Sequence, residues 1–296
     1  MIRNICAYTT IILILSVCIP LFGKEEAVDY FPATLDSYWV YEDQDGNELK
    51  RTVIEGEEIA GEIYKAFNYE PELKDWENFI KYICPELFRI NDKEITLSVK
   101  EGIEKAVKAQ LKKELDLLFK AAVQGGLPIG EAPTFDITVE AEDKMSMLIK
   151  PTVANEEWDV IKINANIEVT QNGELQGTLD YTIIETGIVL GNETVETAAG
   201  TFENCLKVQY QTETTAVFTP EEGGEENPPG ETVTTVWFAP NVGIVKIHEK
   251  TGNMFLDMIP KDEDIPFIFP SAAKEITLEL KKFEIKAEPA SDENTE

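Results

Sequence analysis

The sequence predicts a mainly β protein, in which long strands form a curved antiparallel sheet, as a half-barrel or a sandwich, with one inserted amphipathic helix. Two observations support this class. Runs of alternating apolar and polar residues recur along most of the chain, and Gly, Asn, Asp or Pro separate them. Residues 101–124, by contrast, have a helical periodicity. By a strict count of elements the class is α+β.

The first hundred residues predict short paired strands. Residues 38–42 and 49–54 flank a turn-forming segment at 43–47, which indicates a hairpin. Further short runs rich in aromatic or β-branched residues occur at 58–64, 79–84, 87–90 and 95–99. These runs predict a β-meander.

Residues 101–124 predict an amphipathic helix that ends at the Gly pair 125–126. Its apolar stripe includes Val107, Leu111, Leu115 and Leu118. The stripe has two interpretations. It covers one face or the open end of the sheet, or it forms a lid over an apolar cavity. We favour packing, because every soluble amphipathic helix must bury its stripe.

Long strands are expected after residue 135. Residues 160–170 alternate, and Asn172-Gly173 predicts a tight turn into residues 175–190. The expected organisation is one antiparallel β domain over 24–258 with a helical insertion at 101–133. It is followed by a linker at 259–273, a C-terminal strand at 274–286 that joins the sheet, and a disordered acidic tail at 287–296. A shift of parity at Lys281-Lys282 predicts a β-bulge in that last strand.

Residues 1–23 have the composition of a secretory signal peptide. Arg3 precedes an apolar stretch at 11–22, and Gly23 is followed by charged residues. We expect cleavage after Gly23 and a periplasmic or extracellular protein, with no membrane-spanning segment left after cleavage. The alternative is a membrane-anchored lipoprotein, because residues 15–18 (Leu-Ser-Val-Cys) are similar to a lipobox that would place a lipid on Cys18.

The charge balance limits the partners. The chain has 26 Lys and Arg against 56 Asp and Glu, and a net charge of −30. Such a surface repels nucleic acid and anionic lipid headgroups and keeps a protein soluble. We therefore expect no nucleic-acid partner.

Three stretches form a recognisable set. They are residues 30–32 (Tyr-Phe-Pro) with 38–41 (Tyr-Trp-Val-Tyr), residues 199–208 with the pattern G-T-F-x-x-C-L-x-V, and residues 237–246 with the pattern W-x-A-P-x-V-G-x-V. The set resembles an uncharacterised family of exported bacterial proteins and lipoproteins, over roughly residues 30–100 and 157–258. The resemblance implies export and a curved antiparallel β architecture, and it carries no catalytic residue over.

We interpret the motif residues as fold-defining rather than as ligand-binding, because turn glycines and core aromatics are usually structural. This set comprises Trp39, Gly200, Phe202, Cys205, Trp237, Pro240 and Gly243. Cys84 and Cys205 remain after removal of the signal peptide and form a candidate disulfide in an oxidising compartment. The alternative is that both are small buried apolar residues.

Little in the sequence indicates catalysis or a cofactor. His248 is the single histidine, and no serine lies in a G-x-S-x-G elbow. Beyond the expected signal peptide, the chain has too few His and Cys residues for a zinc site built from several of them. A weak calcium candidate consists of Asp43, Asp45 and Asn47, which a hairpin turn also explains. Acidic residues are abundant, and no pair stands out on an otherwise apolar strand.

These observations predict a noncatalytic exported envelope or secreted protein that acts as a binding or interaction module. Its partner is an unknown envelope protein or an apolar small molecule, and no cofactor is expected. The alternative function is a carrier for a lipid or other apolar ligand in a half-barrel cavity, with the helix at 101–124 as its lid. A hydrolase of an unrecognised type is a distant third.

Overall fold

Alternating apolar residues build most of the chain into strands. The computed structural model describes residues 28–59, 61–76, 78–124, 132–219, 230–253 and 273–287. The expected signal peptide and Cys18 lie outside these residues, as do residues 220–229, most of the expected linker and the tail from residue 288 onward.

Within the described ranges, thirteen strands form one sheet in the order β6-β8-β9-β10-β11-β12-β13-β1-β2-β3-β4-β5-β7, and every pair of neighbours is antiparallel. The strands are β1 Tyr38–Asp43, β2 Glu48–Ile59, β3 Glu62–Glu70, β4 Leu87–Ile90, β5 Glu94–Ser98, β6 Thr134–Ala141, β7 Met145–Ile149, β8 Glu157–Gln171, β9 Glu174–Thr197, β10 Gly200–Thr219, β11 Gly230–Ala239, β12 Gly243–Thr251 and β13 Lys274–Glu284. The helical elements are the short 3-10 helix η1 Leu73–Asp75 and the helix α1 Lys100–Gln124. The mainly β class with one inserted helix is confirmed.

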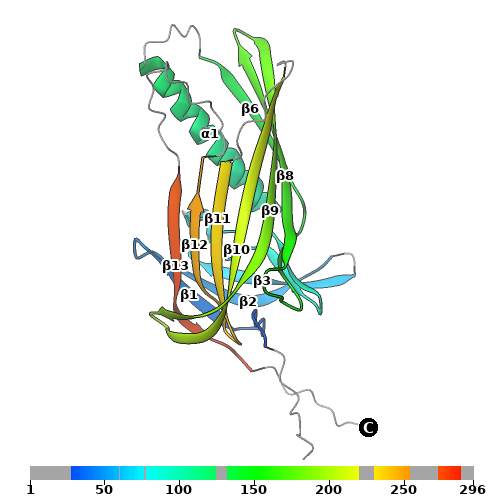
Figure 1. The fold of residues 1–296 in the computed structure, drawn as a ribbon, viewed down its shortest axis with the longest axis vertical. Helices are drawn as coiled ribbons and strands as arrows, with labels where there is room; N and C mark the ends of the chain where they lie inside the picture. The colour runs from blue at the N-terminus through cyan, green and yellow to red at the C-terminus, as the bar shows by residue number, and fades with distance from the viewer. Residues whose placement is uncertain are drawn as a thin grey trace, which may run out of the picture.

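The sheet curves until its two halves face each other. Figure 1 shows the long strands β8 to β13 side by side, whereas β1, β2 and β3 cross them at the lower end. The indole nitrogen of Trp158 in β8 donates to the carbonyl oxygen of Ser146 in β7 at 2.9 Å, and the Tyr210 hydroxyl in β10 donates to the Met147 carbonyl at 2.6 Å. The core lies between these halves. Within the described chain, the outermost strands β6 and β7 do not pair with each other, so the sheet stays open.

Gly187 makes room for this packing. It lies opposite Trp158 in the pairing of β8 with β9, and a Cβ atom at position 187 would lie 2.5 Å from the indole ring. A side chain at this position would therefore push the tryptophan away from the inner face of the sheet.

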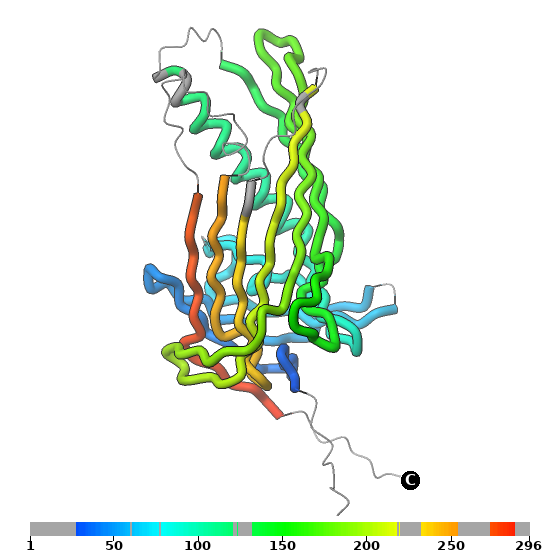
Figure 2. Tube along the Cα trace, in the orientation of Figure 1, coloured from blue at the N-terminus to red at the C-terminus, as the bar shows by residue number. Residues whose placement is uncertain are grey.

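The C-terminal strand β13 lies inside the sheet. It pairs with β12 on one side and β1 on the other, so the last strand lies beside the first (Figure 2). The pairing passes from Lys282 opposite Val40 to Leu280 opposite Tyr41, and it leaves out Lys281. This is the bulge that the sequence predicts at Lys281-Lys282.

Two predicted turns have the backbone that their residues favour. Asn172 and Gly173 have φ values of 53° and 78°, as a tight hairpin turn between β8 and β9 requires. Gly243, which begins β12, has φ of 96°, and a Cβ there would lie 3.5 Å from the ring of Pro32. The 3.5 Å contact is an ordinary one, so it is the positive φ that favours glycine at that position.

The strand expected at residues 79–84 is wrong. This segment forms a turn in which the backbone N–H groups of Ile83 and Cys84 both donate to the carbonyl oxygen of Ile80 at 2.9 Å. Ile80, Tyr82, Ile83 and Cys84 are all buried. A strand buries alternate side chains on one face, whereas this turn directs neighbouring side chains into the core between the two halves of the sheet.

Candidate functional site

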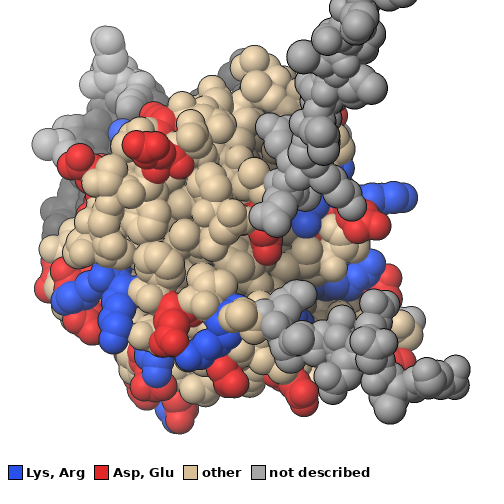
Figure 3. Space-filling model, turned by 90° about the horizontal axis from the view of Figure 1, so that it is seen from below, with Lys and Arg blue, Asp and Glu red and all other residues tan. Residues whose placement is uncertain are grey.

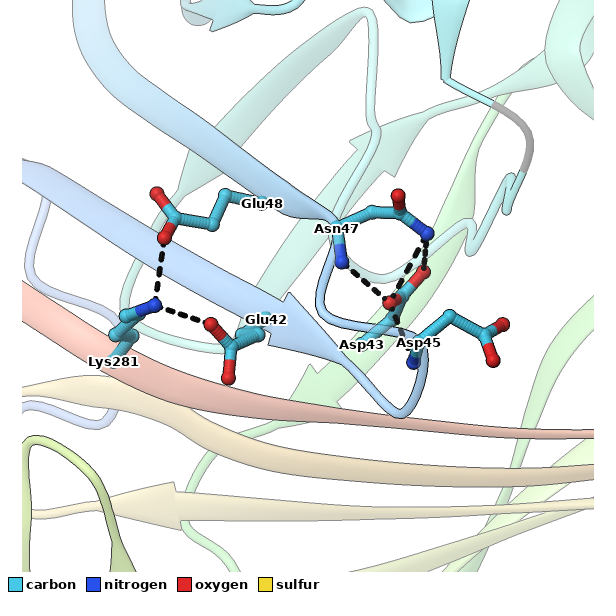
Figure 4. Close-up of polar contacts among 6 residues, drawn as sticks. All are labelled: Glu42, Asp43, Asp45, Asn47, Glu48 and Lys281. Carbon is cyan, nitrogen blue, oxygen red and sulfur yellow. Dashed lines mark hydrogen bonds and ion pairs between the residues drawn. The ribbon is translucent and has the colours of Figure 1, made fainter.

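The calcium candidate is a hairpin turn in which hydrogen bonds from the turn itself and from Asn78 engage Asp43. One carboxylate oxygen of Asp43 accepts hydrogen bonds from the backbone N–H groups of Asp45 at 2.9 Å and Asn47 at 2.8 Å. The amides of Asn47 and Asn78 donate to the other oxygen at 3.0 and 2.8 Å. In Figure 4 the carboxylate of Asp45 points away from Asp43. In the part of the chain that the structure describes, no group of three or more His, Cys, Asp or Glu residues is placed to hold a metal ion.

The apolar stripe of α1 packs into the core. Val107, Leu111 and Leu115 are buried there, and Leu118 is half-buried nearer the C-terminal end of the helix. A surface hollow of about 410 Å³ beside the N-terminus of α1 is lined by Lys100, Glu140, Ala141, Glu142, Asp143, Lys162 and Asn164. A second hollow, of about 300 Å³, lies on the helix itself and is lined by Ala109, Lys112, Lys113, Asp116, Leu117 and Lys120. Charged side chains dominate both hollows.

The predicted fold-defining residues join separate segments. The indole nitrogen of Trp39 donates to the carbonyl oxygen of Val242 at 2.7 Å, in the turn between Pro240 and Gly243. The ring of Phe202 lies 5.9 Å from that of Phe283 in β13, measured between centroids.

The hairpin between β9 and β10 lies at the lower end of the molecule (Figure 1). Seen from below, this end is largely uncharged in its middle, with charged side chains mostly toward the margin (Figure 3).

The candidate disulfide is not formed in the structure. Cys84 and Cys205 are both free and buried. Cys84 closes the turn on Ile80, whereas the thiol of Cys205 faces the carbonyl oxygen of Phe202 at 3.4 Å in β10. Burial raises the pKa of Cys84 to about 12 and also raises the pKa of Cys205, so both thiols stay protonated at neutral pH.

Polar and charged side chains gather on the inner face of the long strands. Glu185 in β9 pairs opposite Thr212 in β10, and Glu249 in β12 pairs opposite Thr234 in β11. The turn at 79–84 brings two further side chains against this face from the other half of the sheet. We call the six residues the inner polar cluster: Lys81, Tyr82, Glu185, Thr212, Thr234 and Glu249.

Glu185 is the centre of the cluster and is almost fully buried, with 2% of its side chain exposed. One carboxylate oxygen, Oε1, accepts from the Tyr82 hydroxyl at 2.7 Å and the Thr212 hydroxyl at 3.3 Å, and it forms an ion pair with Lys81 Nζ at 2.8 Å. The ring of Tyr82 stacks on that of Tyr210 at 4.3 Å between centroids. The other oxygen, Oε2, is buried without a hydrogen-bond partner. Leaving a buried acceptor unsatisfied costs about 1–3 kcal/mol, and more for a charged group.

Glu249 lies at the more open side of the cluster and is half-buried. The hydroxyl groups of Thr234 and Thr251 donate to its two oxygens at 3.3 and 3.4 Å. Desolvation raises the pKa of Glu249, Lys81 opposes this change, and Glu185 adds to it. Desolvation acts to lower the pKa of Lys81, but the two carboxylates outweigh it and raise that pKa. The ammonium of Lys81 therefore stays charged between two carboxyl groups.

A second unsatisfied group lies further along β9. Tyr181 precedes Glu185 by four residues and therefore faces the same side of the strand. Its hydroxyl is buried without a hydrogen-bond partner. Desolvation raises the pKa of Tyr181 well above its ordinary value, and the carboxyl group of Glu114 in α1 raises it further.

Sequence reasoning missed this cluster, although a signal for half of it was present. Glu185 occupies the same alternating face as Ile183 and Val189, and Glu249 continues the face of Val245 and Ile247. Each strand therefore carries one acidic residue on an otherwise apolar face, and the expectation considered pairs alone. Lys81 has no such signal, because the turn at 79–84 places it and its partner Glu185 is distant in the sequence.

Comparison with known proteins gives a match to one family model. Residues 132–254 match the family model of a DUF3108-like domain, a domain of unknown function. The matched range contains Glu185 and Glu249, whereas Lys81 lies outside it. No curated protein matches the chain.

Two solved structures have a low similarity to this chain. A candidate lipoprotein from Parabacteroides distasonis is 17% identical, with a TM-score of 0.37 over 88% of this chain and 100% of that one. A candidate exported protein with a YmcC-like fold from Bacteroides fragilis is 14% identical, with a TM-score of 0.38 over 87% of this chain and 100% of that one. Among the residues that the structure describes, no helix is both long and apolar enough to cross a membrane.

Proposed function

We propose that the protein is a noncatalytic exported binding module, and that the inner polar cluster is its ligand site. The buried and unsatisfied Oε2 of Glu185 is the observation that carries this proposal. An apolar side chain would pack at this position of β9 without that penalty. A buried acceptor without a donor is explained where a bound molecule supplies the donor.

The arrangement suits holding a ligand better than moving a proton. Three donors already converge on Oε1 of Glu185, and an ion pair with Lys81 holds the carboxylate in place. The site also has access from solvent, because 18% of the Lys81 side chain is exposed and Glu249 is half-buried. A preorganised acceptor beside a partly open edge is typical of a polar subsite in a binding protein.

A polar ligand is favoured over a lipid. A lipid carrier with α1 as a lid needs an apolar chamber beneath the helix, but Val107, Leu111 and Leu115 are packed within the core. The inner face opposite the loop at 79–84 also carries threonines and two carboxylates instead of a continuous apolar lining.

Export is the second part of the proposal, and its support is the composition of residues 1–23. Mass mapping of the N-terminus of protein purified from its own host tests it. A chain that begins at Lys24 is expected. A chain that begins at a lipid-modified Cys18 would mean that the exported protein is anchored to a membrane. An intact Met1 would contradict export.

Recovery of a bound molecule tests the binding function. The exported protein is purified from its host and analysed by native mass spectrometry, beside the Glu185→Gln variant and the outer-face control Glu213→Gln. A bound mass in the wild type and the control, lost from Glu185→Gln, is expected. A wild-type protein that carries no molecule and whose cluster signals respond to no added compound of any charge would contradict the function.

A further inference from the structure

We infer that the ligand of the inner polar cluster carries an ammonium group, or a similar organic cation that donates N–H hydrogen bonds. This inference rests on the proposed binding function and specifies the ligand that the same site takes. It follows from the count of donors, the balance of charge and the position of Lys81.

The hydrogen bonds around Glu185 require a donor. Oε1 accepts hydrogen bonds from the hydroxyl groups of Tyr82 and Thr212 and forms an ion pair with the ammonium of Lys81. Oε2 has no hydrogen-bond partner. A carboxylate oxygen accepts hydrogen bonds and donates none. A ligand that satisfies Oε2 therefore presents N–H or O–H groups.

The balance of charge selects a cation among such donors. Two carboxyl groups, of Glu185 and Glu249, face one ammonium, that of Lys81. A bound cation would neutralise the excess negative charge, whereas an anion would meet repulsion from both carboxylates in a poorly solvated place. Desolvation is the main cause of the raised pKa of Glu249, and the charge of Glu185 adds to it, so the two carboxyl groups interact unfavourably.

Lys81 shows that an ammonium group fits the site. Its Nζ lies 2.8 Å from Oε1 of Glu185 and 5.1 Å from the centre of the Tyr82 ring, which is a favourable position for a cation over an aromatic face. An organic cation fits better than a metal ion, because the described residues contain no group of three or more metal-ligating side chains. The second unsatisfied group is the hydroxyl of Tyr181, whose backbone position lies about 14 Å along the strand from that of Glu185, at about 3.4 Å per residue. It would serve a polar group at the far end of an elongated molecule.

Three probes of equal length test the inference: butylammonium, butan-1-ol and butyrate. Each is titrated into the exported full-length protein at constant ionic strength, and the backbone amide NMR signals of residues 81, 185 and 249 are followed. Saturable changes with butylammonium alone are expected. Glu185→Gln should weaken this binding by about tenfold, the effect of one charge-assisted hydrogen bond, and Glu213→Gln should not change it.

Each other outcome has a defined meaning. Binding of butan-1-ol or butyrate at these residues, with no preference for butylammonium, would overturn the ligand class and leave the binding function standing. A crystal structure grown in butylammonium that shows only water on Oε2 of Glu185 would overturn both. If Glu185→Gln does not fold, Glu249→Gln serves instead, and it should also weaken butylammonium because it removes one negative charge.

Discussion

At the scale of single residues, Asp43 illustrates how a turn consumes the groups that a metal site would need. Burial acts to raise the pKa of Asp43, but hydrogen bonds from Asn47, from the backbone of Asp45 and from Asn78 outweigh it and lower the pKa. These hydrogen bonds to the Asp43 carboxylate therefore organise the hairpin between β1 and β2. The neighbouring pair of Glu42 and Glu48 is held by Lys281, which lies 2.7 Å from Glu48 (Figure 4).

Asp43→Ala should therefore lower the free energy of unfolding at neutral pH by about 1–3 kcal/mol. Because the folded pKa of Asp43 lies below its unfolded value, this contribution is present above about pH 4 and fades as the pH falls through the folded pKa. Urea unfolding across this pH range measures the difference from wild type. The exposed Asp45→Ala is the matched control and should change stability by less than about 0.5 kcal/mol. An equal loss in both variants would contradict the role of Asp43.

Arg51 is a second buried charge, and it belongs to the core. Its guanidinium lies 4.5 to 5.5 Å from the ring centres of Phe31, Trp39, Tyr41 and Phe67. It donates to the Tyr41 hydroxyl at 3.0 Å and to the carbonyl oxygen of Ile83 at 3.3 Å, whereas its Nε has no partner. A planar and weakly hydrated cation can stack among aromatic rings, which a compact ammonium cannot do as well.

Arg51→Lys should therefore lose more stability than Arg51→Met, by about 1–3 kcal/mol, as measured by urea unfolding. Methionine leaves no buried charge, and both partners keep other contacts: Tyr41 donates to the Ile244 carbonyl oxygen, and Tyr69 donates to that of Ile83. If the lysine variant were the more stable of the two, the positive charge rather than the stacked plane would be what the core requires.

At the scale of elements, α1 acts as a part of the core. The helix lies against β6, and Leu111 is fully buried while its neighbour Lys112 is exposed. A movable lid would be separated from the sheet by ligand or solvent, and its truncation would change binding more than folding. The observed packing predicts the opposite.

Leu111→Ala should lower the free energy of unfolding by about 2–5 kcal/mol, the usual penalty for truncating a fully buried leucine. Lys112→Ala on the outer face should change it by less than about 0.5 kcal/mol. Thermal and urea unfolding measure both variants. A small loss of unfolding free energy in Leu111→Ala, combined with faster hydrogen exchange of the α1 amides alone, would indicate a helix that opens independently of the sheet.

At the scale of the whole molecule, β13 joins the two halves of the sheet. It lies between β12 and β1, with Leu278 and Leu280 fully buried, and Lys281 ties its bulge to the hairpin of β1 and β2. Without β13, the long strands and the short strands would each present an unpaired edge next to an exposed core.

Removal of residues 274–296 should therefore abolish cooperative unfolding, whereas removal of 288–296 alone should leave the midpoint unchanged. Circular dichroism during urea unfolding distinguishes the two truncations. A cooperative transition in the longer truncation would mean that the long-stranded half folds by itself.

The sequence by itself determined the elements that depend on neighbouring residues. Period-two alternation placed the long strands, Asn172-Gly173 placed a hairpin turn, the shift of parity at Lys281 placed a bulge, and three- and four-residue spacing placed α1. Each of these follows from local stereochemistry, so a short window of residues contains the necessary information.

Only the tertiary structure decided what depends on distant partners. The segment at 79–84 has strand-like composition, yet it folds as a buried turn because the space between two halves of a curved sheet accepts consecutive apolar side chains. The same turn brings Lys81 to Glu185 across more than a hundred residues, and no local pattern encodes that meeting. The inner polar cluster, with its unsatisfied carboxylate oxygen, exists only once the sheet has curved far enough for its halves to face each other, because the energy of a buried charge depends on which side chains surround it.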